Sequence, residues 1–89
     1  MDDRRKMLKF RAWRRGFREI DLILGGFADR HLADMDEAHV DAFERLLGEA
    51  DSDLYEWITE TRAPPPELDT PTLALIRCFR FSVSDALKT

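Results

Sequence analysis

The amino-acid sequence predicts an all-α protein, a compact single-domain five-helix bundle that occupies residues 1–89. Apolar residues recur at helical spacing in five segments, and most of these segments carry residues typical of helix starts or ends. No segment alternates between apolar and polar residues as a half-buried strand does. Because the connections between segments are short, successive helices should lie next to one another around one core.

The first predicted helix runs from about Asp3 to Trp13. Asp2 or Asp3 suits its start, since a carboxylate there accepts hydrogen bonds from backbone N–H groups that have no partner within the helix. Met7, Phe10 and Trp13 recur toward one side. We therefore expect this helix to pack against the core by that edge.

The second predicted helix begins near Arg15 or Gly16 and is expected to supply the centre of the core. At 100° per residue, one face of it holds Phe17, Ile20, Leu24, Phe27 and His31. Gly25 and Gly26 interrupt this helix, and each costs about 1 kcal/mol relative to alanine. Either the helix bends at the two glycines or a neighbouring segment approaches them closely.

The third and fourth helices carry local signals at their ends. Asp36 can cap the third helix and Gly48 can end it; its apolar stripe consists of Val40, Phe43, Leu46 and Leu47. The fourth helix is short, covers residues 51–58 and also begins with an Asp cap. Its inner side is expected to hold Leu54, Trp57 and Ile58.

Three consecutive prolines, residues 64–66, lie before the last helix and predict an extended turn, because proline fixes its backbone angle and has no N–H donor. The last helix then begins at Thr70-Pro71, a capping residue followed by proline at the first helical position. Its inner stripe is expected to consist of Leu73, Ile76 and Phe79.

The charge of the chain is divided unevenly. Residues 1–18 carry eight Lys and Arg against two Asp, a net charge of +6, whereas the rest of the chain carries −10. A basic end can steer the protein toward an acidic surface. The acidic remainder would repel phosphate, and no helix-turn-helix or RNA-binding signature follows, so we expect no nucleic acid partner. A small nucleic-acid-binding adaptor with a basic end stays open as an alternative.

Composition also predicts where the protein works. Cys78 is the single cysteine, so no internal disulfide can form, which is typical of a reducing compartment. No apolar run approaches the roughly 20 residues that span a bilayer, so we expect no membrane insertion. The basic N-terminal segment opens with Asp-Asp and lacks serine, unlike a mitochondrial transit peptide. We expect an uncleaved, soluble protein of the bacterial cytoplasm.

Few side chains suggest catalysis or metal binding. His31 and His39 flank Asp34 and Asp36, but the spacing matches no standard metal motif. We expect His31 to be half-buried on the core face and His39 to lie in solvent. Cys78 has no motif-linked histidine, and we expect a buried, inert thiol. The sequence therefore predicts no enzyme, no metal site and no cofactor of its own.

Residues 14–21 form the most unusual stretch. On the expected second helix, Arg15 and Glu19 share an outward stripe with Leu22, and Gly16 leaves a gap that another polypeptide can enter. Arg15 can offer a planar fork to a carboxylate or carbonyl, and Glu19 can accept from an arginine or a backbone N–H. An ordinary ion pair at i,i+4 beside a helix-start glycine explains the same residues equally well.

This stretch reads Arg15-Gly16-Phe17-Arg18-Glu19 and resembles the RGxxE motif of the SdhE/YgfY-like family of succinate dehydrogenase assembly factors. Trp13-Arg14 and residues 20–25 extend the resemblance on both sides. Residues 43–47 (FERLL) and 51–58 (DSDLYEWI) are similar to the family's second block. The likeness runs from about Arg4 to Ile76, in the order and at the spacings of the family.

The resemblance implies a monomeric helical domain that is not an enzyme. It would bind the flavoprotein subunit of succinate dehydrogenase, and in some bacteria that of fumarate reductase, and promote covalent attachment of FAD to a histidine of that client. FAD would then belong to the client. The resemblance implies that Arg15, Gly16 and Glu19 contact the partner. We add Trp13 and Asp21 as partner-binding residues because they lie next to the motif. A general protein-interaction domain with a partner that holds no flavin is the alternative.

Overall fold

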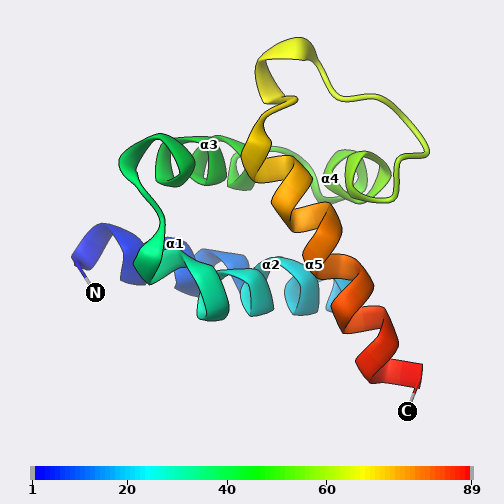
Figure 1. The fold of residues 1–89 in the computed structure, drawn as a ribbon, viewed down its shortest axis with the longest axis horizontal. Helices are drawn as coiled ribbons and strands as arrows, with labels where there is room; N and C mark the ends of the chain where they lie inside the picture. Colours follow the sequence, from blue (N-terminus) through cyan, green and yellow to red (C-terminus); the bar gives the residue numbers. More distant parts are fainter. Residues whose placement is uncertain (1, 89) are drawn as a thin grey trace.

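The computed structural model describes residues 2–88, with the side chains of residues 2–80. It contains five α-helices (Figure 1): α1 (Asp3–Ala12), α2 (Arg18–His31), α3 (Glu37–Leu47), α4 (Asp51–Ile58) and α5 (Pro71–Lys88). Single 3₁₀ turns at Leu32–Asp34 and Pro66–Leu68 precede α3 and α5. No strand forms within residues 2–88, so the predicted all-α class and the five-helix architecture are confirmed.

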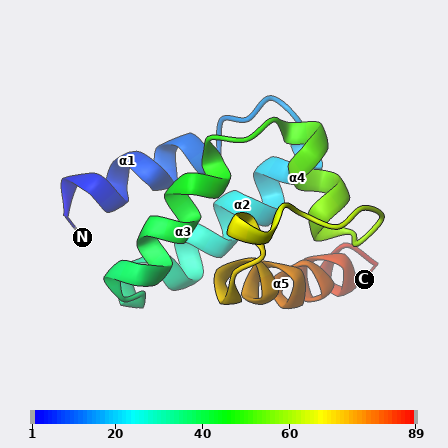
Figure 2. The same ribbon diagram turned by 90° about the horizontal axis from the view of Figure 1, so that it is seen from above.

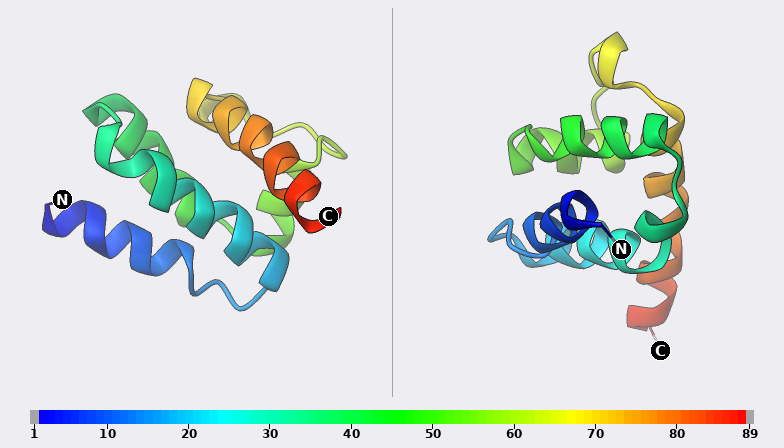
Figure 3. Two further views of the ribbon diagram at one scale, coloured as in Figure 1. Left: turned by 60° about the horizontal axis from the view of Figure 1, so that its bottom comes forward. Right: turned by 90° about the vertical axis from the view of Figure 1, so that its left-hand side faces the viewer.

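The helices form two layers that α5 joins. α1 and α2 lie side by side and run antiparallel, with α3 and α4 on one side of the pair (Figures 1 and 2). α5 crosses both layers and contacts α2, α3 and α4 (Figure 3). The rings of Phe27 from α2 and Phe43 from α3 meet 5.6 Å apart in the core between the layers. α1 contacts both α2 and α3, which places the basic end of the chain beside the rest of the fold.

The inward face of α1 is not the predicted one. Leu8 and Ala12 are buried, whereas Met7 and Phe10 keep 64% and 58% of their surface exposed. The small Ala12 side chain lets α1 lie close to its neighbours, and the larger apolar residues are left on the outside. Because α1 has apolar residues on two faces, periodicity could not tell which of them is buried.

The start of α2 also differs from the prediction. The helix begins at Arg18, and Phe17 precedes it as a half-exposed N-cap residue instead of a core residue. Gly16 turns the chain with a φ of +86°, a left-handed conformation that favours glycine. His31 is exposed at the other end of the helix, so its predicted half-buried state is wrong, although its ring lies 5.0 Å from that of Phe27.

Gly25 and Gly26 are explained by close approach of other helices and not by a break, because α2 continues through both. A Cβ atom on Gly25 would lie 2.2 Å from Cδ2 of Trp13. A Cβ atom on Gly26 would lie 3.0 Å from Cζ of Phe79 on α5. The two glycines therefore let an indole from the end of α1 and a phenyl ring from α5 lie against the helix backbone.

The predicted inner stripes of α3 and α4 and the core residues Ile20, Leu24 and Phe27 of α2 are confirmed as buried. Asp36 caps α3 by accepting from the backbone N–H of His39, and Gly48 follows the last residue of α3. The predicted cap of α4 is wrong: Ala50 is the N-cap residue, and the carboxylate of Asp51 binds Arg15 instead. Two residues of α5, Leu73 and Ile76, are buried, and Phe79 packs partly buried against the core.

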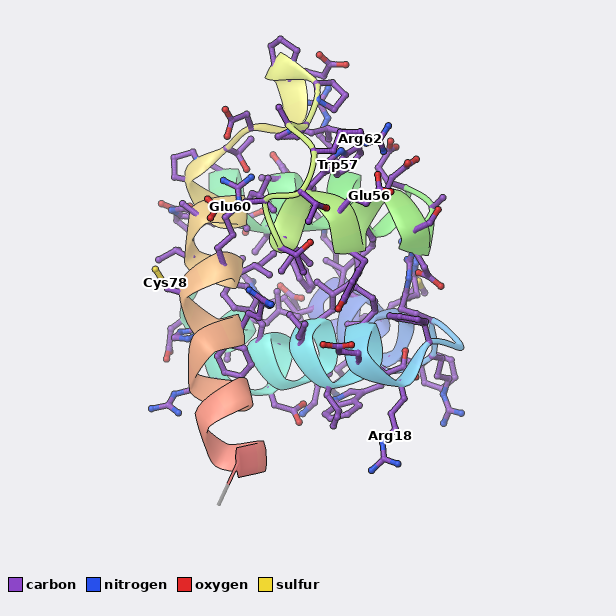
Figure 4. The ribbon with its side chains drawn as sticks, turned by 90° about the vertical axis from the view of Figure 1, so that its right-hand side faces the viewer. Arg18, Glu56, Trp57, Glu60, Arg62 and Cys78 are labelled. Carbon is purple, nitrogen blue, oxygen red and sulfur yellow. The ribbon has the colours of Figure 1, made fainter. Side chains whose placement is uncertain are left out.

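Two predictions about single side chains are corrected by the structure. Cys78 is exposed on the outer side of α5 (Figure 4), because the buried stripe of that helix passes through Ile76 and Phe79. His39 does not lie freely in solvent: its Nδ1 is 2.6 Å from Oγ1 of the buried Thr72. This contact links the first turn of α3 to the first turn of α5.

Glu60, just after α4, has a φ of +63°, where a side chain costs about 1–2 kcal/mol. Glu60→Gly removes this cost, but glycine also has more freedom in the unfolded chain, which offsets part of the gain. The free energy of unfolding should therefore rise by about 0.5–1 kcal/mol. Urea denaturation followed by circular dichroism measures this. Glu67→Gly, at an exposed position without positive φ, is the control and should lower stability; an equal loss in both variants would contradict the assignment.

Candidate functional site

The guanidinium of Arg15 is held inside the protein and is not offered outward. Its Nε donates to the carboxylate of Asp51 over 2.7 Å, and its two terminal nitrogens donate to the carbonyl oxygens of Leu47 and Glu49. Only 13% of the side chain is exposed. Arg15 therefore joins the loop between α1 and α2 to the junction of α3 and α4, and it satisfies a carbonyl at the end of α3 that has no helical partner.

Asp21 holds the same loop from the other side. Its carboxylate accepts from the backbone N–H of Arg15 over 2.8 Å, and the residue is half-buried. The expectation that Arg15 and Glu19 share one helical stripe is wrong, because α2 begins only at Arg18. Arg15 and Asp21 instead determine the path of the loop that contains Gly16.

Gly16 and Glu19 both remain accessible. A Cβ atom on Gly16 would meet no other atom within 4 Å, and Glu19 is exposed in the first turn of α2. Phe17 lies between them with 43% of its surface exposed. Among the charged groups here, Arg18 points away from the body of the protein (Figure 4). Residues 16–19, together with Tyr55, are called the Gly16–Glu19 surface below.

Two shallow hollows, each of about 500 Å³, flank Phe17 on this surface. One is lined by Gly16, Phe17, Asp51, Ser52, Tyr55 and Glu56, and the other by Phe17, Arg18, Glu19 and Leu22. The rings of Phe17 and Tyr55 meet edge to face at 5.4 Å. The surface thus has an aromatic centre with carboxylates at its edge, a composition suited to an apolar side chain with a cationic or N–H donor beside it.

Trp13 serves mainly to join α1 to α2. Its ring covers Gly25, and its Nε1 donates to the carboxylate of Asp29 over 3.2 Å. Lys9 binds the same carboxylate over 3.1 Å. Trp13 still exposes 37% of its surface, so one edge of the indole remains open to a partner.

Sequence reasoning missed Phe17 and Tyr55 as site residues. Phe17 was assigned to the core face because the helix was expected to begin before it. The neighbouring Gly16 was the available signal, since a glycine required for a left-handed turn ends the helical period there. No comparable local signal marks Tyr55, whose role depends on α4 lying beside the loop.

Within residues 2–80, no group of three or more His, Cys, Asp or Glu side chains could hold a metal ion. None of the helices described for residues 2–88 is long and apolar enough to cross a membrane. The arrangement at the Gly16–Glu19 surface fits the binding of another polypeptide.

Comparison with known proteins gives the family of this chain. The family described as "flavinator of succinate dehydrogenase" matches residues 6–80. A relative from Candida glabrata, named succinate dehydrogenase assembly factor 2, mitochondrial, is 39% identical over 69 residues, which cover 75% of this chain and 45% of the relative. The protein of the same name from Drosophila virilis is 36% identical over 76 residues, covering 83% of this chain and 48% of the relative.

The chain therefore spans about half the length of the curated relatives it matches. The family match covers most of the chain, from the middle of α1 to the middle of α5, and includes the Gly16–Glu19 surface. On this evidence, the chain belongs to the family of flavinators of succinate dehydrogenase.

Proposed function

We propose that this chain binds the flavoprotein subunit of succinate dehydrogenase and promotes the covalent attachment of FAD to it. The observation that carries the proposal is the family match over residues 6–80. The names of the relatives, which call them succinate dehydrogenase assembly factors, support it. FAD belongs to the client in this proposal, and the chain supplies no catalytic group. The related subunit of fumarate reductase is a further proposed client.

The Gly16–Glu19 surface is the proposed docking site. Glu19 accepts a hydrogen bond from a cationic side chain or a backbone N–H of the client, and Gly16 leaves room for the client backbone. Phe17 and Tyr55 supply apolar contact. Arg15 and Asp21 hold the loop in position, and Trp13 fixes the end of α1. The two residues of the motif that contact the client directly are thus Gly16 and Glu19.

Binding would act by selecting one conformation of the client. The client conformation that binds best is the one in which FAD and the acceptor histidine are already aligned, and alignment of two reacting groups lowers the barrier to their reaction. The bond-forming chemistry then comes from the cofactor and the client. This explains how a domain without convergent catalytic side chains can accelerate the reaction.

Glu19→Ala should weaken binding to the purified flavoprotein subunit about tenfold, since it removes a charged acceptor worth about 1.5 kcal/mol. The rate of covalent flavin formation at limiting chain concentration should fall in proportion. In-gel fluorescence of the flavin that stays on the denatured subunit measures that rate. Glu67→Ala, which changes another exposed carboxylate, on the Pro66–Leu68 turn, is the matched control and should behave as wild type.

Gly16→Arg should weaken binding more than Gly16→Ala. Both variants bear the same cost of a side chain at positive φ, about 1–2 kcal/mol of folding stability, but only arginine fills the hollow. Normal flavin attachment with both Gly16→Arg and Glu19→Ala, in folded protein, would reject the docking assignment.

The second candidate is a general interaction domain with a partner that holds no flavin. Affinity capture from native host cells distinguishes the two, because the proposal requires a flavoprotein as the main partner. Yellow colour and flavin fluorescence of the captured protein are the readout. The nucleic-acid adaptor is not favoured by the family match.

We further propose that the chain acts as a monomer, which the family resemblance implies, and in the bacterial cytoplasm, a reducing compartment that the single cysteine favours. The relatives are named as mitochondrial. Fractionation of the native host, together with light scattering of the purified chain, tests the compartment and the oligomeric state.

A further inference from the structure

The exposed side of α1 carries Met7 and Phe10, which lie outside the core, and one edge of the Trp13 indole, whose ring also packs on Gly25. The large apolar residues that are exposed among the described side chains are Met7, Phe10, Trp13, Phe17 and Leu75. Met7, Phe10 and Trp13 are spaced three residues apart, so each lies next to the one before it along α1 and its C-cap. Exposed apolar side chains gathered in this way mark an interaction surface more often than scattered ones do.

Basic side chains surround this apolar row. One hollow is lined by Lys6, Lys9, Phe10, Trp13 and Arg14, and a second by Phe10, Arg11, Arg14, Arg15, Ala50 and Asp51. The guanidinium of Arg14 stacks on the ring of Phe10, with its Cζ 4.2 Å from the ring centroid. Met7, Phe10, Trp13, Lys6, Lys9, Arg11 and Arg14 together are called the basic-apolar face of α1 below.

The other basic residues of α1 are already neutralised within the protein. Arg4 binds Glu37, Asp41 and Glu44 on α3, and the hydrogen bonds that its guanidinium donates to Asp41 and Glu44 raise the pKa of Arg4 above its usual range. Arg5 binds Asp2 and the carbonyl oxygens of Leu32 and Met35. These contacts hold α1 to its neighbours, whereas the charges of Lys6 and Arg14 lie beside the exposed apolar row.

We propose that the basic-apolar face of α1 binds an acidic segment of the flavoprotein subunit, one that places an apolar side chain against Phe10 and carboxylates against Lys6 and Arg14. The inference rests on the proposed function for the identity of the partner. The chemistry of the segment follows from charge complementarity with Lys6, Arg11 and Arg14, which line the two hollows beside Phe10. α1 has 10 residues and is about 15 Å long, which suits a segment of two to three helical turns.

The surroundings of this face favour a short polypeptide over a membrane or a nucleic acid. Carboxylates bound it on both sides: Asp29 lies beside Lys9 and Trp13, and Asp51 lies beside Arg15. A bilayer or a duplex extends beyond α1 and would bring its phosphates against the acidic remainder of the chain, which carries −10. A short acidic segment can remain within the basic area.

The second hollow also connects the two surfaces. It is lined by Phe10 and Arg14 from the basic-apolar face and by Arg15 and Asp51, and Asp51 also lines the hollow beside Gly16. The two surfaces are therefore adjacent, and one client can contact both of them at the same time. Two contacts on one client strengthen each other, because the second forms at a high effective concentration.

The first test measures the affinity of the full chain for the purified flavoprotein subunit by titration calorimetry. Phe10→Ser and Arg14→Glu should each weaken binding about tenfold, the effect typical of a central interface residue. Raising the salt concentration should weaken wild-type binding more than binding of Arg14→Glu. Leu75→Ser and Arg45→Glu, which change exposed residues on α5 and α3, are matched controls and should stay within about twofold of wild type.

The outcomes separate this inference from the proposed function. Wild-type affinity and salt dependence in both Phe10→Ser and Arg14→Glu, with binding still weakened by Glu19→Ala, would overturn only the inference about α1. No binding of the wild-type chain to the subunit would overturn the proposed function and, with it, the assigned partner of α1.

The second test identifies what lies against Phe10. A photoreactive benzoylphenylalanine at position 10 should cross-link to a peptide of the subunit with net negative charge, identified by mass spectrometry; a neutral or basic peptide would overturn the inference. Phosphatidylglycerol vesicles test the membrane alternative. Sedimentation of the wild-type chain but not of Phe10→Ser with these vesicles, with equal affinity of both for the subunit, would assign this face to lipid instead.

Discussion

Arg15→Ala is expected to lower the free energy of unfolding by about 3 kcal/mol, because it removes a charged donor from three acceptors at once. These acceptors are the carboxylate of Asp51 and the carbonyl oxygens of Leu47 and Glu49. The side chain is mostly buried, so water replaces its hydrogen bonds poorly. Urea denaturation followed by tryptophan fluorescence measures the loss.

Arg15→Lys is expected to lose about 2 kcal/mol, because an ammonium group cannot reach three acceptors in the geometry of a planar fork. Arg14→Ala is the matched control: Arg14 is the neighbouring arginine, is exposed and stacks on Phe10, so its loss should cost less than about 0.5 kcal/mol. Equal stability of Arg15→Ala and Arg14→Ala would contradict the internal role of Arg15.

The same variants indicate how Arg15 contributes to docking. If Arg15 acts by holding the Gly16 loop, flavin attachment should fall in Arg15→Ala together with the protection of the amides of residues 15–17 from hydrogen exchange. Loss of flavin attachment with unchanged amide protection would mean that Arg15 contacts the client directly, contrary to the bonds it makes here.

Gly25→Ala is expected to destabilise the protein by about 2 kcal/mol, although alanine is the better helix former. The added methyl group would lie 2.2–2.7 Å from three ring atoms of Trp13, so the indole has to leave its place on α2. Displacement of a packed ring costs about 1–3 kcal/mol and exceeds the gain of about 1 kcal/mol in helix propensity. The displaced indole also loses its hydrogen bond to Asp29.

A double-mutant cycle makes this prediction sharp. In a Trp13→Ala background the obstacle is absent, and Gly25→Ala should then raise stability by about 1 kcal/mol, so its effect changes sign. Gly26→Ala provides a comparison, because its methyl group meets only the edge of the Phe79 ring at 3.0–3.1 Å; its effect should be close to zero. Destabilisation by Gly25→Ala in both backgrounds would show that another contact is responsible.

Much of the fold could be predicted because its signals are local. The cap at Asp36, the end of α3 at Gly48 and the start of α5 after Thr70 each depend on residues within one helical turn. The buried stripes of α3 and α4 could be predicted as well, because each of these helices has one apolar face.

The region of the candidate site could be predicted from the sequence, but which of its residues face a partner and which hold the loop could not. The motif from Arg15 to Glu19 indicated the region, and Gly16 and Glu19 are accessible as expected. Arg15 and Asp21 were expected to face a partner, whereas the structure uses both to hold the loop. The acceptors of Arg15 lie 32 to 36 residues further along the chain, so no local pattern reveals them.

Helix type, helix ends and the family resemblance thus follow from the order of the residues, since hydrogen bonds within a turn and the 3.6-residue period act between near neighbours. Which face of α1 is buried, where α2 begins and what Arg15 binds were decided only when distant segments packed together. An arginine, a glycine or a row of apolar residues can make several alternative contacts of similar free energy. Which of these contacts forms depends on the segments that pack beside it in the fold.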